Sequence, residues 1–279
     1  MNILTFDIEE WYNCDFISEN FDWSNYEVRI YDSVERILTE LDRRNIKGTF
    51  FCLGWLAENH PRVIKMIQEG GHQIGCHSYQ HQLSTRFDKK SFREDTYKAK
   101  SLIEDVLGEN IQCFRAPGFS ITQNNPWTFE VLYELGFKYD SSVFPAHHDY
   151  GGMPNYGEST PSLISYNGVL LKEFPINIHK ILNHNLVFSG GGFFRLFPYN
   201  LIRKWGKEAK YMMTYFHPRD FDPDQPLIEE LPRIRKFKSY VGLKTSFKKF
   251  QRLLSEFDFV NIAEADRLID WDHVKTIKL

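Results

Sequence analysis

Strand-like and helix-like segments alternate along most of this chain, with short connections between them. Segment 34–44, for example, places Val34, Ile37, Leu38 and Leu41 on one face of a helix. Repeated strand–helix–strand units build a parallel sheet, because the crossover helix returns the chain to the same sheet edge. We therefore predict an α/β fold with strands at 3–7, 48–53, 73–76, 111–114, 137–144, 170–175, 211–216 and 259–262, and helices at 34–44, 61–69, 91–107, 126–135, 199–209 and 247–257.

The number of units favours a sheet closed into a barrel over an open sheet. Roughly seven or eight parallel strands fit within the 279 residues of the chain. The chain has no internal repeat and no linker rich in Pro, Gly and Ser, so we expect one domain spanning residues 1–279. Residues 146–167 are rich in Gly, Pro, Tyr and His and are expected to form a long loop insertion.

Composition and charge exclude several classes of protein. Hydrophobic residues make up 42% of the chain and charged residues 25%, which excludes a disordered chain. The net charge of −3 gives no basic field for nucleic acid, and no apolar run approaches the roughly 20 residues that would cross a membrane. Cys14, Cys52, Cys76 and Cys113 are scattered, and the N-terminus lacks a secretory signal. We expect a reduced, cytoplasmic protein with no nucleic-acid partner and no transmembrane segment; the pattern does not indicate an oligomeric state.

Polar side chains directly follow the predicted strands, at the sheet edge where α/β proteins collect their functional groups. Asp7 and Glu9 come at the end of the first strand and lie on one face of it, by the two-residue period of strands. The pair suits a general base beside a metal ligand, although an acidic pair is also typical of a solvated turn. His77 and His81 follow the strand 73–76 with a spacing that lets two imidazoles face one cation.

Three later strands carry residues that would complete such a site. Arg115 follows the strand 111–114 and has the geometry to bind a carboxylate through two nitrogens. Asp140 lies within the strand 137–144, and His217 follows the strand 211–216. A single histidine at a strand end is usually structural. Chemical groups at the ends of five strands, however, favour a catalytic site.

The ordered set of motifs resembles the polysaccharide deacetylase family, the NodB-homology carbohydrate esterases. Residues 77–81 (His-Ser-Tyr-Gln-His) resemble the family's H-[ST]-x-x-H metal motif, and residues 115–119 (Arg-Ala-Pro-Gly-Phe) resemble its R-x-P-x-[FWY] motif, which forms a wall of the groove. Residues 140–142 resemble the fourth motif, and 216–217 the final histidine motif. The Gly-rich run 189–199 is similar to a branch associated with exopolysaccharide synthesis loci. The fold implied is a distorted (β/α) barrel.

The resemblance implies a metal-dependent hydrolase that removes an N-acetyl group from an acetamido sugar or glycan precursor in cell-surface polysaccharide biosynthesis. The commonest first motif of the family, T-F-D-D, has adjacent aspartates, whereas Ile8 here separates Asp7 from Glu9, so Glu10 is an alternative carboxylate ligand. The resemblance also implies a role for each site residue. Glu9, His77 and His81 hold one divalent metal ion, zinc by preference with cobalt, nickel or iron as alternatives. Asp7 is the base and His217 the acid, and Arg115 holds Asp7 with Asp140 completing the ion pair.

The substrate is the least determined part of this hypothesis. Candidate substrate-binding residues are Trp11, Pro117, Phe119 and Gly191. A cytoplasmic enzyme would meet a nucleotide-linked or lipid-linked acetamido sugar rather than an exported polymer. Two alternatives stay open: an allantoinase-like or formamidase-like amidohydrolase on the same barrel, and a non-catalytic glycan-binding protein.

Overall fold

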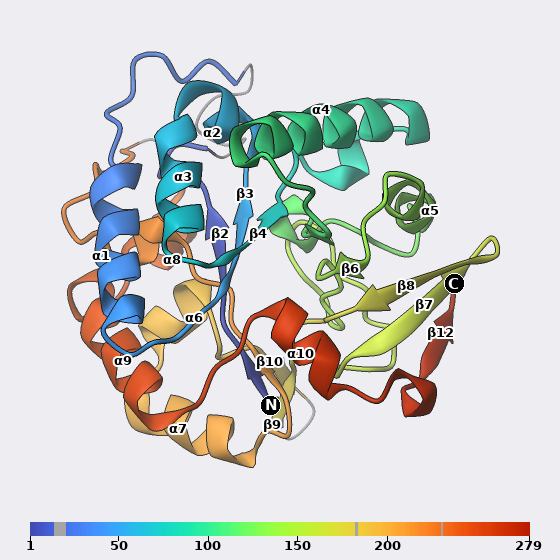
Figure 1. Ribbon diagram of the computed structural model, residues 1–279. Helices are drawn as coiled ribbons and strands as arrows, with labels where there is room; N and C mark the ends of the chain where they lie inside the picture. The colour runs from blue at the N-terminus through green and yellow to red at the C-terminus, as the bar shows by residue number, and fades with distance from the viewer. Residues whose placement is uncertain (14–20, 182–183, 230) are drawn as a thin grey trace.

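The computed structural model describes residues 1–13, 21–181, 184–229 and 231–279, and its centre is an eight-stranded sheet (Figure 1). The strand order is β12-β7-β8-β6-β5-β4-β3-β2. All neighbours from β2 to β8 are parallel, whereas β7 runs antiparallel to β8. The α/β class with a mostly parallel sheet is thus confirmed. These strands are β2 (Thr5–Ile8), β3 (Thr49–Cys52), β4 (Gln73–Cys76), β5 (Cys113–Phe114), β6 (Tyr139–Asp140), β7 (Ser162–Tyr166), β8 (Val169–Glu173) and β12 (Thr276–Lys278).

Helices connect successive parallel strands and pack their apolar stripes on the sheet. In α1, Val34, Ile37 and Leu41 are fully buried. At the start of α4 the Asp88 carboxylate accepts a hydrogen bond from Ser91 N, and Gly108 ends the helix with a positive φ of 73°. The helices are α1 (Ile30–Asp42), α2 (Gly54–Asn59), α3 (Pro61–Glu69), α4 (Lys89–Leu107), α5 (Trp127–Glu134), α6 (Gly191–Leu196), α7 (Tyr199–Glu208), α8 (Arg233–Tyr240), α9 (Leu243–Glu256) and α10 (Ile262–Leu268).

The sheet continues past β2 into the C-terminal half of the chain. β1 (Asn2–Ile3) pairs in parallel with β11 (Met212–Met213), and an isolated parallel bridge joins Phe6 to Phe216. A further parallel bridge joins Tyr215 to Gly190. The first strand therefore lies between β3 on one side and residues 212–216 on the other, which brings the start of the chain beside a distant segment of its C-terminal half.

Side-chain hydrogen bonds, rather than a backbone ladder, connect the segment after β8 with the region of β11. Tyr211 Oη donates to Pro175 O at 2.9 Å. Asn177 Oδ1 accepts from Met213 N at 2.9 Å and from Ser189 Oγ at 3.1 Å. Among the residues described, no backbone ladder joins these two edges, and these side-chain hydrogen bonds connect them.

The structure differs from the sequence expectation in several connections. The segment 146–167, expected to be one loop, ends in the sheet strand β7. The segment 259–262, expected to be a strand, makes only a bridge from Val260 to Ile3, because Asn261 instead caps α10. Elements that were not expected include the hairpin of β9 (His179–Ile181) with β10 (His184–Leu186), the helices α2, α6 and α10, and the strand β12.

Two further observations concern membrane-spanning helices and the cysteines. Within the ranges that the structure describes, every helix is too short or too polar to cross a bilayer. Cys52, Cys76 and Cys113 are buried free thiols on neighbouring strands, and Cys14 lies outside the described residues.

Candidate active site

The carboxyl ends of β2 and β4 bring Glu9, His77 and His81 together. One ligand atom from each of these residues lies within 4.8 Å of the other two. His81 Nε2 is 2.8 Å from Glu9 Oε2, and the rings of His77 and His81 are 5.3 Å apart between centroids. All three side chains are buried or nearly so.

The turn that carries the two histidines has an uncommon backbone. Ser78 and His81 have positive φ angles of 67° and 61°, which non-glycine residues seldom adopt. The turn is fixed from both sides, since Ser78 Oγ accepts from His81 N at 3.1 Å and Ser78 O accepts from Gly54 N at 2.9 Å. Such conformations persist where the surroundings impose them, and here they direct His81 towards Glu9.

The three residues fit a divalent cation by their chemistry. His77 Nδ1 donates to Arg115 O at 2.7 Å, which leaves Nε2 as its ligand atom. Burial lowers the pKa of His77 to about 4, so the imidazole is neutral. Glu9 Oε2 is buried and lies 2.8 Å from His81 Nε2. A carboxylate oxygen and two imidazole nitrogens form a donor set typical of catalytic zinc sites.

Glu9 is the negative group of this cluster. Burial is the largest influence on its pKa and raises it, but the charge and hydrogen bond of His81, with the charges of His217 and His77, outweigh burial and bring the pKa to about 2. Glu10, the alternative ligand, lies elsewhere. Glu10 Oε1 accepts from the backbone nitrogens of Arg29 and Ile30 at 2.6 and 2.7 Å, so this side chain caps α1.

Asp7 lies beside this cluster in an ion pair with Arg115. Arg115 Nη1 is 2.7 Å from Asp7 Oδ1 and 2.8 Å from Thr5 Oγ1. The remaining guanidinium donors bind Ser141 O at 3.2 Å and Ser141 Oγ at 2.9 Å. Arg115 is fully buried and Asp7 is 3% exposed. The guanidinium thus fixes the position of the carboxylate in a site with little water.

Asp140 does not complete the Arg115 ion pair as expected. Its carboxylate accepts from Ser142 Oγ at 2.6 Å and from Ser142 N at 3.0 Å, and Arg115 acts on it only as a nearby charge. Ser141, the next residue, takes the guanidinium instead, because alternate residues of a strand face opposite sides. Asp140 is the register partner of Glu173 on β8, and both are fully buried. Burial, and then the charge of Asp140, raise the pKa of Glu173 well above its usual range.

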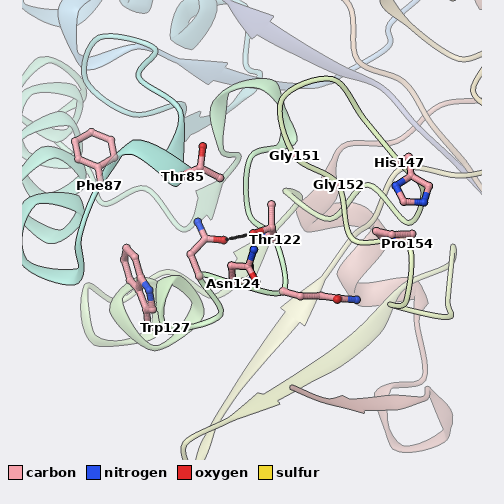
Figure 2. Close-up of a pocket in the computed structure, with 11 residues that line it drawn as sticks. Thr85, Phe87, Thr122, Asn124, Trp127, His147, Gly151, Gly152 and Pro154 are labelled. Carbon is pink, nitrogen blue, oxygen red and sulfur yellow. Dashed lines mark hydrogen bonds between the residues drawn. The ribbon is translucent and has the colours of Figure 1, made fainter.

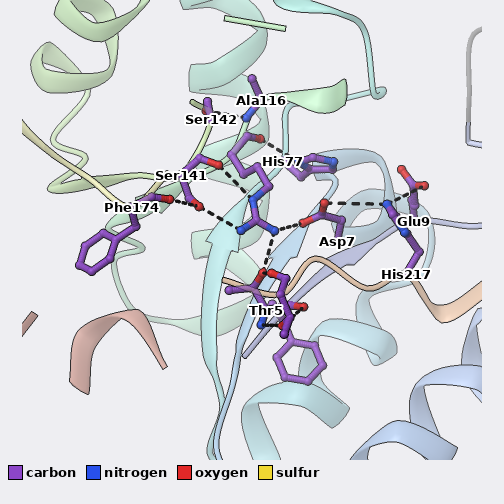
Figure 3. Close-up of polar contacts among 12 residues, drawn as sticks. Thr5, Asp7, Glu9, His77, Ala116, Ser141, Ser142, Phe174 and His217 are labelled. Atoms are coloured by element: carbon purple, nitrogen blue, oxygen red, sulfur yellow. Dashed lines mark hydrogen bonds and ion pairs between the residues drawn. The ribbon is translucent and has the colours of Figure 1, made fainter. Parts of the chain in front are cut away.

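His217 faces Asp7 and Glu9 from the strand on the other side of β2. Its Nε2 is 3.9 Å from Asp7 Oδ2 and 3.9 Å from Glu9 Oε1. Figure 3 shows Asp7, Glu9 and His217 converging on one point. Phe216 N donates to Thr5 O at 3.2 Å and Asp7 N donates to Phe216 O at 2.8 Å, so neighbouring strands set this distance.

The other ring nitrogen of His217 is held by Asp220, which was not among the predicted residues. Nδ1 is 3.0 Å from Asp220 Oδ2, and the same oxygen accepts from His217 N at 2.9 Å. Burial is the largest influence on the pKa of His217 and lowers it, but Asp220, Glu9 and Asp7 together raise it to about 9. A carboxylate three residues after the histidine was a signal available in the sequence.

The predicted substrate-binding residues are mostly buried by protein. Trp11 is 7% exposed, donates to Glu27 O at 2.9 Å and packs edge-on against Tyr12 and Tyr26. Pro117 is buried, and Phe119 packs against Tyr215. Gly191 donates to Tyr215 O at 3.1 Å with a positive φ of 53°, so it allows the close approach of α6 to that strand.

A separate pocket of about 470 Å³ lies between the turn after His81, the turn before α5 and the segment that follows residue 146 (Figure 2). Its walls combine two aromatic rings with neutral amides and hydroxyls, and none of its described lining residues is acidic, lysine or arginine. The lining residues are Thr85, Phe87, Thr122, Gln123, Asn124, Asn125, Trp127, His147, Gly151, Gly152 and Pro154. Such a surface is typical of sites for uncharged sugars.

Comparison with known proteins divides the chain into two matched parts. Residues 4–139 match the family model described as polysaccharide deacetylase, and residues 141–267 match one described as Domain of unknown function (DUF3473). A peptidoglycan-N-acetylglucosamine deacetylase of Bacillus cereus is 32% identical over 96 residues. That match covers 34% of this chain and 35% of the relative, so the chain spans about a third of its length.

Solved structures share the fold over nearly the whole chain. A Mycobacterium smegmatis protein described as a polysaccharide deacetylase aligns with a TM-score of 0.67 at 18% identity, covering 100% of this chain and 92% of that one. An allantoinase aligns with a TM-score of 0.61 at 15% identity, covering 95% and 88%. These likenesses show the fold alone.

Proposed function

Because residues 4–139 belong to the polysaccharide deacetylase family, we propose that this chain is a metal-dependent hydrolase that removes the N-acetyl group from an acetamido sugar. The observation that supports this most is the placement of Asp7 and His217 beside the Glu9, His77 and His81 cluster, with Asp7 Oδ2 and His217 Nε2 3.9 Å apart. A base and an acid beside a cation site are what amide hydrolysis requires.

Each side chain has one role in this proposal. Glu9, His77 and His81 hold a divalent ion, for which zinc is the first candidate; the bound ion would polarise the acetyl carbonyl and acidify water. Asp7 takes the proton of the attacking water, and Arg115 keeps that carboxylate oriented. His217 gives its Nε2 proton to the departing nitrogen, which takes the electron pair of the broken C–N bond. The products are acetate and a free amine.

We further propose that the neutral pocket binds sugar units of the substrate next to the acetamido group. The rings of Phe87 and Trp127 offer apolar faces, and the amides of Gln123 and Asn124 offer hydrogen bonds. A cytoplasmic location remains a prediction and would favour a nucleotide-linked or lipid-linked sugar. The neutral lining provides no cation for a diphosphate, so a carrier phosphate would lie outside this pocket.

The test is acetate release from acetamido-sugar oligomers, nucleotide-linked acetamido sugars and lipid-linked ones, with metal-depleted protein and with protein reloaded with zinc or cobalt. His77→Ala is expected to lose both metal and turnover. His60→Ala, a matched histidine substitution near α2 and outside the site, is expected to keep both. Acetate that depends on metal supports the proposal and identifies the carrier.

Two outcomes would count against the proposal in different ways. Protein that binds metal but releases no acetate, and instead opens allantoin, would favour the amidohydrolase alternative. Folded protein that binds neither zinc nor cobalt would favour a glycan-binding protein without catalysis.

A further inference from the structure

A second buried ion pair lies behind His217, on the Nδ1 side of its ring. Arg195 Nε is 2.8 Å from Asp220 Oδ1, while Asp220 Oδ2 binds His217. Arg195 is 6% exposed and Asp220 is 2% exposed. The two oxygens of one carboxylate are therefore divided between a guanidinium and an imidazole, so the position of Arg195 determines where Asp220 can hold the ring.

Arg195 itself binds three backbone carbonyls at the end of α8. It lies on α6, and its Nη1 donates to Ser239 O at 2.8 Å and to Val241 O at 3.1 Å. Its Nη2 donates to Lys238 O at 3.0 Å, so the guanidinium binds the carbonyls at the end of α8. A planar group with donors in fixed directions matches this set of acceptors, which a lysine ammonium cannot.

We propose that Arg195 is a positioning residue for His217, acting through Asp220 so that the Nε2 proton points at the nitrogen that leaves during hydrolysis. The inference rests on the proposed function and assigns a task to the part of the chain that matches a domain of unknown function, residues 141–267. Asp220 holds Nδ1, and the fixed ring then presents only Nε2 to Asp7 and Glu9.

The chemistry of the leaving group distinguishes this role from a general structural one. An amide nitrogen departs only if it receives a proton as the C–N bond breaks and takes the electron pair. An aryl acetate releases a stable phenolate without that proton, although Asp7 must still activate water. Loss of ring positioning should therefore slow amide hydrolysis and leave aryl-ester hydrolysis nearly unchanged.

The first experiment compares kcat and KM for an N-acetylglucosamine oligomer and for 4-nitrophenyl acetate in the metal-loaded protein. In Arg195→Gln and Asp220→Asn, kcat for the amide is expected to fall about tenfold or more with little change in KM, and ester turnover is expected to stay within about twofold. Arg195→Lys is expected to recover part of the loss. Lys172→Met, which breaks an ion pair with Asp266 elsewhere, should change neither rate.

The second experiment needs no substrate. In metal-free wild-type protein, ¹H–¹⁵N NMR should detect a slowly exchanging Nδ1 proton on His217, because Asp220 accepts it. Arg195→Gln should lose this signal, and Lys172→Met should retain it. If Arg195→Gln does not fold, Arg195→Lys and Asp220→Asn answer the same question.

The possible outcomes separate the two proposals. Amide and ester rates that fall together in Arg195→Gln, or an Nδ1 proton that persists there, would overturn the positioning role. A wild-type protein that hydrolyses neither substrate but loses the Nδ1 proton in Arg195→Gln would count against the deacetylase function while supporting the structural link.

Discussion

Two buried arginine–aspartate pairs flank the candidate site, and they differ in whether their aspartate faces the site directly. Arg115 binds Asp7 at 2.7 Å, and Asp7 itself faces the site. Arg195 binds Asp220 at 2.8 Å, but Asp220 faces His217 rather than the site. The same pair of residue types thus contacts the proposed base directly in one place and the proposed acid through Asp220 in the other.

The two pairs also rest on different kinds of structure. Arg115 donates to Thr5 on β2 and to Ser141 beside β6, so rigid neighbouring strands hold it. Arg195 donates to the end of α8, a helix in which every residue is at least partly exposed. The comparison teaches that the proposed base is fixed by the sheet, while the proposed acid depends on helices packed outside it.

The largest expected effect separates the two aspartates by reaction. Asp7→Asn should slow amide and aryl-ester hydrolysis alike, by about 100-fold to 10,000-fold, because both reactions need a base for the attacking water. Metal content should be retained, since Asp7 is not among the clustered ligand residues. Steady-state rates with metal analysis check this. If Asp7→Asn still hydrolysed the aryl ester at the wild-type rate, its effect would not differ from that expected for Asp220→Asn, and the prediction would be wrong.

The second prediction concerns stability. Arg115→Met should lower the free energy of unfolding by about 3–5 kcal/mol, because it leaves the buried Asp7 carboxylate without its cation. Arg195→Met should cost less, because the backbone nitrogen of His217 still donates to Asp220. Denaturant unfolding of metal-free protein measures both. Equal losses would show that the sheet and the helices support their pairs equally well.

A third prediction concerns the effect of Asp220 on the pKa of His217. In metal-free Asp220→Asn, the pKa of His217 should fall from about 9 towards its ordinary value near 6.5. A raised histidine pKa stabilises the fold fully below pH about 6.5, and this contribution is lost as pH rises through 9. The stability advantage of wild type over Asp220→Asn should therefore be largest near pH 6 and shrink towards pH 9. NMR titration and unfolding at several pH values provide the measurement; a difference independent of pH would contradict it.

A fourth prediction concerns Glu173, which belongs to neither pair. Its pKa is raised, so the folded state holds a proton that the unfolded state releases above pH about 4.5. Stability should then decline by about 1.4 kcal/mol per pH unit until the folded pKa is reached. Glu173→Gln should remove this slope because glutamine does not titrate, whereas Glu130→Gln, on an exposed ion pair, should leave it in place.

The residues that end strands were predictable from the sequence because strand periodicity and strand order constrain them strongly. Asp7, Glu9, His77, Arg115 and His217 lie at one edge of the sheet for that reason. The same reasoning placed Asp140 beside Arg115, but it did not anticipate which of the residues 140 and 141 would face the guanidinium. A shift of one residue along a strand reverses the face.

Residues that reach the site from outside the sheet were less predictable. Arg195 lies in the Gly-rich run 189–199, and only the packing of α6 against Tyr215 and α8 reveals its direction. Trp11 was a plausible sugar platform by residue type. Its burial involves Tyr26, which is well separated from it in the sequence.

The pairing of residues 212–216 with the first strand has a consequence for synthesis on the ribosome. Glu9, His77 and His81 leave the ribosome long before His217, and domains tend to fold from the N-terminus onwards. A nascent chain would then hold the three proposed metal ligands while His217, the proposed proton donor, is still untranslated. Translation of residues 212–217 would complete the proposed site, so a product truncated before residue 217 would lack the proposed proton donor.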